Sequence, residues 1–237
     1  MKRFADKKAW IFDLDNTLYP AECNLFAQVD QRMGDFISKY LEISFASARQ
    51  IQKDYYQIYG TTLAGLMVRH GLEPKEFLDY VHDIDFSVLP QAPDLGAALD
   101  KLPGRKFIFT NGSKEYAEKV AAELGVLSHF DDVFDIAATG YVPKPDIAAY
   151  RRFLEAFGVA PAGAAMFEDL PQNLEAPHAL GMATVLVNTR YHNHPAYQVI
   201  DTWDASPDHV HHLTEDLAGF LRQVIAVLNG QTAPASD

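Results

Sequence analysis

Two aspartates, Asp13 and Asp15, follow a short apolar run and are the first residues whose spacing predicts chemistry. In extended backbone, residues two apart point to the same side, so both carboxylates can face a crevice beyond the end of a strand. Carboxylates that close repel each other unless a cation or a proton lies between them. One could then act as a nucleophile and the other as an acid/base, although Asp-x-Asp-x-Thr is also typical of an ordinary capped turn.

Polar clusters also follow three other predicted strands. Thr110 and Asn111 open a helix, where backbone N–H groups can hold a phosphate. Lys144 lies between two prolines, which restrict the backbone and could direct the ammonium group to one place. Glu168 and Asp169 are adjacent carboxylates directly after an apolar run, where burial without a cation would be costly.

Each cluster alone has a structural explanation, either helix capping or a solvated surface charge. Together, however, the clusters occupy the carboxyl ends of different predicted strands, and in open α/β sheets ligands bind at this edge. The set combines carboxylates, one lysine, one hydroxyl and one amide. Its hard oxygen ligands suit Mg²⁺ and a phosphate that the ion would bridge. The sequence therefore predicts a phosphoryl-transfer site.

The elements that position these clusters alternate along the chain. Short apolar runs predict five strands, at residues 8–12, 106–110, 133–137, 164–167 and 183–187. Helical periodicity predicts helices at 94–102, 113–124, 146–157, 174–180 and 216–228. Strands that alternate with helices imply right-handed βαβ units on a parallel sheet, so the predicted fold class is α/β. The Pro-, Asp- and His-rich stretch 192–212 is predicted to be irregular.

A helical block interrupts this order after the first strand. Apolar spacing predicts helices at 25–41, 45–59, 62–70 and 74–81, and Ser44 is a candidate N-cap for the second. We therefore expect a Rossmann-like core of residues 1–18 and 90–229, an all-helical cap domain inserted at 19–89, and a flexible tail at 230–237.

Composition limits the classes of partner. The chain has 237 residues, 48% of them hydrophobic, and a net charge of −12, which is globular but disfavours binding to a nucleic acid polymer. A small phosphorylated ligand needs only local positive charge or a metal cation. Cys23 is the only cysteine, so no intrachain disulfide can form. Because no apolar stretch has the length of a signal sequence or a membrane span, we expect a cytoplasmic protein with no membrane partner.

In motif order, spacing and insertion point, the chain resembles the haloacid dehalogenase superfamily. The four signatures of that family are matched by Asp13-x-Asp15-x-Thr17, Thr110, Lys144 and Glu168-Asp169. The helical block is also similar to the pyrimidine 5′-nucleotidase subgroup, on residues 59–66, 70–71, 76–78 and 81–85 together with 12–20.

The resemblance implies a mechanism in which Asp13 attacks phosphorus and forms an aspartyl-phosphate that water hydrolyses. Asp15 would protonate the leaving group and later deprotonate the water. Thr110, Asn111 and Lys144 would hold the phosphoryl oxygens.

The resemblance also implies a Mg²⁺ cofactor. Its ligands would be the Asp13 carboxylate, the Asp15 main-chain carbonyl and Asp169, with Glu168 nearby or ligating through water. In the helical block, polar and aromatic groups could contact a base or sugar, or could serve as caps and packing residues: Tyr59, Thr61, Thr62, His70 and His82.

The expected function is a Mg²⁺-dependent phosphomonoester hydrolase, a 5′-nucleotidase acting on pyrimidine nucleoside monophosphates. The alternatives are a promiscuous sugar-phosphate or flavin mononucleotide phosphatase, a phosphomutase, and a non-catalytic binding protein. Dehalogenase relatives attack carbon and lack an acid/base at the position of Asp15, which favours phosphate-ester chemistry here. The sequence indicates neither the oligomeric state nor the physiological substrate.

Overall fold

A six-stranded parallel sheet forms the centre of the computed structural model, which describes residues 1–189 and 200–230. The strand order is β3-β2-β1-β4-β5-β6. The strands are β1 (Ala9–Phe12), β2 (Arg105–Phe109), β3 (Asp132–Phe134), β4 (Ala164–Glu168), β5 (Ala183–Val187) and β6 (His212–Thr214). The predicted α/β class with a parallel sheet is confirmed.

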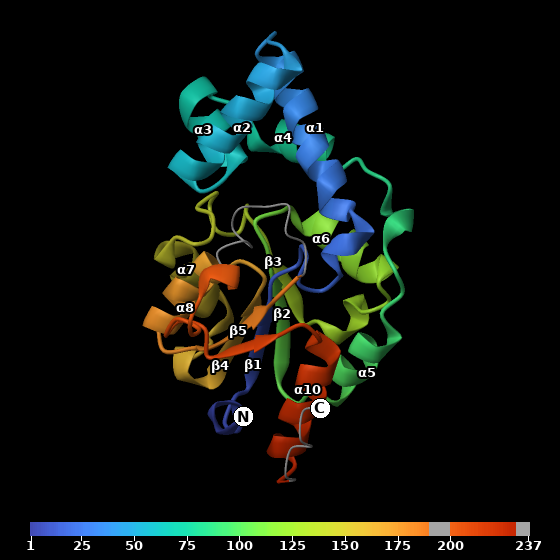
Figure 1. Ribbon diagram of the computed structural model, residues 1–237, viewed down its shortest axis with the longest axis vertical. Coiled ribbons are helices and arrows are strands. Elements are labelled where there is room, and N and C mark those ends of the chain that lie inside the picture. Colours follow the sequence, from blue (N-terminus) through green and yellow to red (C-terminus); the bar gives the residue numbers. More distant parts are fainter. Residues whose placement is uncertain (190–199, 231–237) are drawn as a thin grey trace.

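The helices fall into two groups in space (Figure 1). One group stands above the carboxyl edge of the sheet: α1 (Leu25–Tyr40), α2 (Phe45–Tyr59), α3 (Thr62–His70) and α4 (Pro74–Val81). The other group covers the two faces of the sheet: α5 (Pro93–Lys101), α6 (Lys114–Glu123), α7 (Ile147–Phe157), α8 (Glu175–Ala179) and α10 (Leu217–Leu228). The first group is called the helical block below; the domain limits 19 and 89 stay a prediction.

The sheet is buried on both faces, which explains the continuous apolar runs of its strands. Along β1, Trp10 and Phe12 pack with α5, α6 and α10, whereas Ala9 and Ile11 pack with α7 and α8 on the opposite face. Phe12 also stacks on Phe167 of β4, with ring centroids 4.5 Å apart. This three-layer core fixes where the central strands end, and so where the residues that follow them lie.

Short-range capping sets the limits of the helices in the block. Ser44 accepts a hydrogen bond from the Ser47 main-chain N–H at 3.2 Å, so its predicted role as the N-cap of α2 is confirmed. Gly60 ends α2 in the left-handed conformation, with φ of 82°, which a glycine adopts without the steric cost of a Cβ.

Two strand predictions differ from the structure. The third strand ends at Phe134 rather than at residue 137, because the Asp135 carboxylate accepts from the main-chain N–H groups of Lys114 (3.0 Å) and Ala138 (2.9 Å) and turns the chain. No strand was predicted at β6, whose first residue, His212, is the last of the stretch predicted to be irregular. Its three residues pair with β5 alone, so tertiary pairing rather than local pattern creates it. Residues 192–199 and 231–237 of the predicted irregular stretch and tail lie outside the described residues.

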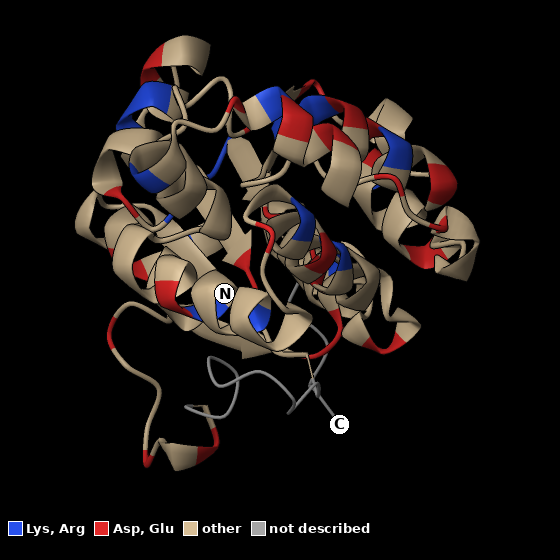
Figure 2. Ribbon diagram, turned by 90° about the horizontal axis from the view of Figure 1, so that it is seen from above, with Lys and Arg blue, Asp and Glu red and all other residues tan. Residues whose placement is uncertain are grey.

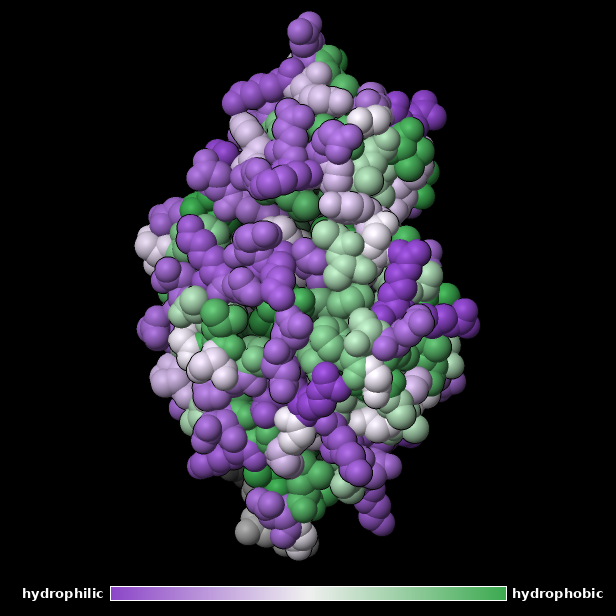
Figure 3. Space-filling view, turned by 180° about the vertical axis from the view of Figure 1, so that it is seen from behind, coloured by the Kyte–Doolittle hydropathy of each residue, from purple (hydrophilic) through white to green (hydrophobic). Residues whose placement is uncertain are grey.

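The surface agrees with the acidic composition. Seen from above, Asp and Glu occur on helices across the view, with fewer Lys and Arg between them (Figure 2). From behind, hydrophilic side chains cover much of the molecule and hydrophobic ones gather near its middle (Figure 3). Among the described residues, the helices all fall short of the length and apolar character that crossing a membrane requires.

Candidate active site

The loop after β1 brings Asp13 and Thr17 together. The Asp13 N–H donates to the Phe167 carbonyl oxygen at 2.9 Å, so Asp13 stays fixed at the end of the sheet. The chain then turns at Asn16, whose φ of 58° lies in the left-handed region that asparagine tolerates. This turn returns the Thr17 hydroxyl to 3.2 Å from Asp13 Oδ2, to which it donates.

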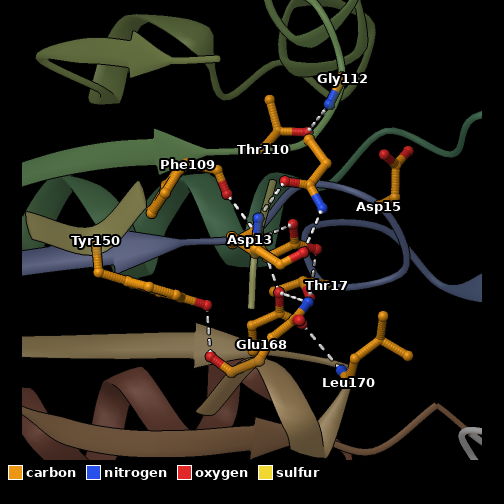
Figure 4. A network of polar contacts seen from close by, with 12 residues as sticks. Asp13, Asp15, Thr17, Phe109, Thr110, Gly112, Tyr150, Glu168 and Leu170 are labelled. Atoms are coloured by element: carbon orange, nitrogen blue, oxygen red, sulfur yellow. Dashed lines mark hydrogen bonds and ion pairs between the residues drawn. The ribbon is translucent and has the colours of Figure 1, made fainter. Parts of the chain in front are cut away.

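Lys144 lies at the centre of the buried charges. Its Nζ donates to Asp13 Oδ1 at 2.6 Å, to Glu168 Oε1 at 2.7 Å and to the Phe109 carbonyl oxygen at 2.9 Å (Figure 4). The Lys144 side chain is 1% exposed, so water does not share these contacts. An ammonium group has three donors, and all three are used.

The pKa values of these groups reflect burial first and neighbouring charge second. Burial lowers the pKa of Lys144, but attraction to Asp13 and Glu168 outweighs it and raises the pKa above the ordinary value. Burial raises the pKa of Asp13 to about 7, against the attraction of Lys144. For Glu168, burial also acts upward, yet Lys144 and further hydrogen bonds hold its pKa below the usual value. The pKa values of Asp13 and Glu168 shift in opposite directions because the Glu168 carboxylate accepts hydrogen bonds from more donors.

Those further donors surround Glu168. Oε1 accepts from the Asn173 side-chain amide at 2.6 Å in addition to Lys144, and Oε2 accepts from the Leu170 N–H at 2.9 Å. The Tyr150 hydroxyl donates to the Asn173 carbonyl oxygen at 2.6 Å and so fixes that residue in turn. Glu168 is therefore held rigidly, with most of its acceptor sites already in use.

A divalent cation fits the donor set. Asp13, Glu168 and Asp169 are buried and each offers a carboxylate oxygen, all within 4.8 Å of one another. Two of the three carboxylates, Asp13 and Glu168, bind the single ammonium group of Lys144, so the buried cluster has more carboxylates than cationic groups. Hard carboxylate oxygens are the ligands that Mg²⁺ prefers. Three of the residues predicted to bind a metal, Asp13, Glu168 and Asp169, are thus brought together.

Thr110 and Asn111 reach the same edge from β2 and use their side chains differently. The Thr110 hydroxyl oxygen accepts from the Gly112 N–H at 2.9 Å, which leaves its own O–H free to donate. The Asn111 amide instead binds the main chain of Lys144, accepting from its N–H at 2.9 Å and donating to its carbonyl oxygen at 3.2 Å. Asn111 therefore holds the lysine in place with the side chain that the sequence assigned to a phosphate contact.

Asp15 belongs to a separate hydrogen-bond network. Its Oδ1 accepts from the Tyr19 hydroxyl at 2.5 Å and from the Tyr116 hydroxyl at 2.6 Å. In Figure 4 it stands apart from the contacts around Asp13. Burial raises the pKa of Asp15, and the hydrogen bonds from Tyr116 and Tyr19 oppose that rise. Burial and the neighbouring Asp15 raise the pKa of both tyrosines well above the usual value.

The helical block approaches the site through the end of α2. The Tyr56 hydroxyl oxygen accepts from the Gln172 side chain at 3.2 Å, and burial followed by the charges of Glu168 and Asp169 raises the pKa of Tyr56. At the next turn, a Cβ on Gly60 would lie 3.3 Å from Pro143 Cγ, one residue before Lys144. The Tyr56 phenol therefore lies close enough to Glu168 and Asp169 for their charges to raise its pKa.

The candidates that the sequence offered in the block have capping or packing partners within the protein. Thr61 is the N-cap of α3, Thr62 donates to the Gln52 carbonyl oxygen, and His70 hydrogen-bonds to the Tyr55 hydroxyl at 2.7 Å. Tyr59 packs edge-on against Tyr55, and the His82 ring stacks on Tyr116. The sequence missed Tyr19, Tyr56, Tyr116 and Asn173, because each lies in a stretch where its pattern predicts only packing or capping.

The family follows from a comparison with known proteins. Residues 7–181 match the family model described as haloacid dehalogenase-like hydrolase. The chain belongs to this hydrolase family. Phosphate metabolism protein 8 of Saccharomyces cerevisiae is 26% identical over 198 residues, which are 76% of this chain and 61% of that protein. The (S)-2-haloacid dehalogenase of Xanthobacter autotrophicus is 27% identical over 169 residues, 65% of this chain and 64% of that protein.

A third relative, enolase-phosphatase E1 of Frankia alni, is 40% identical over 86 residues, 35% of this chain and 36% of that protein. The matches to these curated relatives thus span less than two thirds of their length. Among solved structures, a HAD phosphatase from Thermococcus onnurineus has a TM-score of 0.61 at 21% identity and covers 94% of this chain and 99% of its own. L-2-haloacid dehalogenase from Xanthobacter autotrophicus has a TM-score of 0.56 at 18% identity and covers 92% of this chain and 98% of its own. At these identities the structures demonstrate the shared fold.

Proposed function

We propose that this hydrolase is a Mg²⁺-dependent phosphomonoesterase that acts through an aspartyl-phosphate on Asp13. The observation that carries the proposal is Asp15, a second carboxylate two residues away that is held in its own network, separate from the ion pair of Asp13 with Lys144. An ester oxygen needs a proton when it leaves, and a halide does not. The names of a phosphate metabolism protein and of phosphatases among the relatives support the same chemistry.

In the first step, an Asp13 carboxylate oxygen forms a bond to phosphorus while the bond from phosphorus to the ester oxygen breaks. Asp15, in its protonated form, gives its proton to that oxygen, so the alcohol departs neutral. The Thr110 hydroxyl, the Asn111 N–H and the Lys144 ammonium are the donors we assign to the phosphoryl oxygens. Lys144 would then exchange part of its contact with Asp13 for contact with the phosphoryl group.

In the second step, water attacks phosphorus and the bond from phosphorus to Asp13 breaks. Asp15, now a carboxylate, accepts the proton of the water, which returns both aspartates to their starting state and releases phosphate. Asp13, Asp169, Glu168 and the Asp15 main-chain carbonyl are the groups that would hold Mg²⁺. When bound, this ion offsets the negative charge of the phosphoryl group and of the carboxylates around it.

For the substrate, we propose a nucleoside monophosphate with a pyrimidine base. The support is the likeness of the helical block to the pyrimidine 5′-nucleotidase subgroup. We assign the contact with the leaving nucleoside to the end of α2, where Tyr56 accepts from Gln172 and Gly60 lies beside Pro143. Sugar phosphates and flavin mononucleotide are the alternatives.

A phosphate-release screen over nucleoside monophosphates, sugar phosphates and flavin mononucleotide tests this proposal. We expect release with Mg²⁺, none with a chelator, and the highest kcat/KM for pyrimidine monophosphates. Product analysis by phosphorus NMR would reveal a phosphomutase, since the phosphoryl group would move within the substrate. Absence of release from every compound with Mg²⁺ present would overturn the proposal and favour a binding protein.

A second candidate activity is hydrolysis of a carbon–halogen bond. It is supported by the 27% identity to (S)-2-haloacid dehalogenase of Xanthobacter autotrophicus. Asp15 weighs against it, because a dehalogenase has no use for a proton donor at this place. Halide release from 2-haloacids decides between the two: we expect none, and halide release without phosphate release would replace the phosphatase proposal.

A further inference from the structure

We propose that Tyr19 and Tyr116 are positioning residues that direct the Asp15 carboxylate for proton transfer. The inference rests on the proposed function, because it assigns a role to residues around its acid/base. Both hydroxyls donate to the same oxygen, Oδ1, at 2.5 and 2.6 Å. The two tyrosines are 2% and 3% exposed, so water does not readily replace either donor.

Two donors on one oxygen fix the direction of the whole carboxylate. With Oδ1 held at two points, rotation about the Cβ–Cγ bond would break both hydrogen bonds, so Oδ2 stays the oxygen available to a substrate. Hydrogen bonds to a charged group are among the stronger ones in proteins, and loss of one is worth roughly tenfold or more in an equilibrium. The two oxygens of Asp15 thus have separate roles: Oδ1 accepts from the tyrosines, and Oδ2 carries the proton that is transferred.

The Tyr116 ring is itself fixed from two sides. The His82 ring stacks on it, with centroids 4.1 Å apart and planes 7° apart, and His82 Nδ1 lies 3.1 Å from the Ser113 hydroxyl oxygen. On another side, Gly112 leaves room for the ring, since a Cβ there would lie 3.1 Å from Tyr116 Cδ1. Tyr19 comes from the loop after β1, only four residues from Asp15. The donors therefore reach Asp15 from two separate parts of the chain.

The test compares two phosphate esters that differ in their need for an acid. p-Nitrophenolate leaves without a proton, whereas the alkoxide of an alkyl phosphate requires one. We expect kcat/KM for the alkyl ester to fall roughly tenfold in Tyr116→Phe and in Tyr19→Phe, and by more in the double variant. The same parameter for p-nitrophenyl phosphate should change less than threefold. kcat/KM is the right quantity because it reports the first phosphoryl transfer, where Asp15 acts as the acid.

Tyr150→Phe is the matched control. It also removes a buried hydroxyl near the site, but that hydroxyl donates to the Asn173 carbonyl oxygen and not to Asp15. Any fall in kcat/KM that this variant causes should be by the same factor for both esters. The positioning role is overturned if the Tyr19 and Tyr116 variants lower kcat/KM for both esters by the same factor, or leave kcat/KM for both esters unchanged. The phosphatase proposal stands in either case. If the wild-type chain hydrolyses neither of these esters nor any compound of the phosphate-release screen, the proposed function fails first, and the role falls with it.

Discussion

The carboxyl edge of the sheet, called the edge below, and the helical block use charged residues in opposite ways. At the edge, Lys144 and Glu168 are paired with side chains 1% exposed, and each has several hydrogen bonds besides the ion pair. In the block, Lys75 and Asp79 pair across one turn of α4 with side chains 82% and 65% exposed. Ion pairs in water contribute little to stability, but a buried charge that loses its partner is strongly unfavourable.

The difference distinguishes a region suited to chemistry from one suited to packing. The edge holds charge in a form that folding alone does not favour, whereas the polar groups of the block satisfy caps and packing. The contacts between the two regions include the hydrogen bond from Gln172 to Tyr56 and the stacking of His82 on Tyr116. We therefore expect substitutions at the edge to have large effects and those in the block small ones.

The largest effect is expected for Asp13→Asn. The amide has similar size but is a poor nucleophile, so phosphate release should fall at least roughly 1,000-fold. Steady-state kinetics with Mg²⁺ measures this, and circular dichroism checks that the fold is kept. Near-normal turnover in the variant would show that Asp13 is not the nucleophile.

Lys144→Met sharpens the contrast in stability. Removing the ammonium leaves Asp13, Glu168 and Asp169 buried together, and breaking a buried pair costs about 3–5 kcal/mol in the free energy of unfolding. Lys75→Ala in α4 should cause no measurable change, since its pair lies in water. Urea unfolding with chelator present compares the two. Equal losses would contradict the distinction between edge and block.

His82 supplies a prediction about pH at the junction of the two regions. Burial lowers its pKa from 6.5 to about 4, so the unfolded chain binds the proton more tightly than the folded one between these values. Stability from this residue is present above pH 6.5 and is lost as the pH falls towards 4, by about 3 kcal/mol. His82→Phe keeps a ring on Tyr116 and should remove this part of the acid sensitivity. Identical pH profiles of unfolding for the two proteins would contradict the prediction.

The smallest effect is expected for Tyr56→Phe in α2. Loss of the hydroxyl removes its contact with Gln172 and a polar group beside the acidic cluster, so KM should rise by a few-fold with kcat nearly unchanged. Tyr55→Phe, which loses a hydrogen bond to His70 within the block, is the control and should leave KM unaltered. A fall in kcat of tenfold or more in Tyr56→Phe would mean that the block takes part in the chemistry itself.

Much of the fold was predictable because burial on both faces leaves a strong local pattern. The strand at residues 164–167 is a continuous apolar run in the sequence and differs from β4 by a single residue. Helices such as α7 carry both an N-cap and a terminal glycine, Asp146 and Gly158. By contrast, β6 is too short for its sequence to be distinguished from a loop, and it exists because β5 offers an edge with which to pair.

The site was predictable where motif residues follow strands, and not where residues meet only in space. Asp13 and Glu168 come together as predicted because they lie at the ends of the neighbouring strands β1 and β4, and Lys144 reaches both from the loop between β3 and α7. Tyr116 reaches Asp15 across 101 positions of sequence, and no spacing rule predicts such a contact. Asn111 was assigned to phosphate by its residue type, whereas its amide binds the main chain of Lys144.

The most direct test of the central claim is to look for the phosphoryl group on the protein. The chain is mixed with substrate and Mg²⁺, quenched in acid within the first turnover, digested, and analysed by mass spectrometry. We predict a peptide heavier by one phosphoryl group, with the modification on Asp13 and none in Asp13→Asn. Rapid phosphate release with an unmodified Asp13 peptide at every quench time would show that water attacks the substrate directly, and would contradict the mechanism.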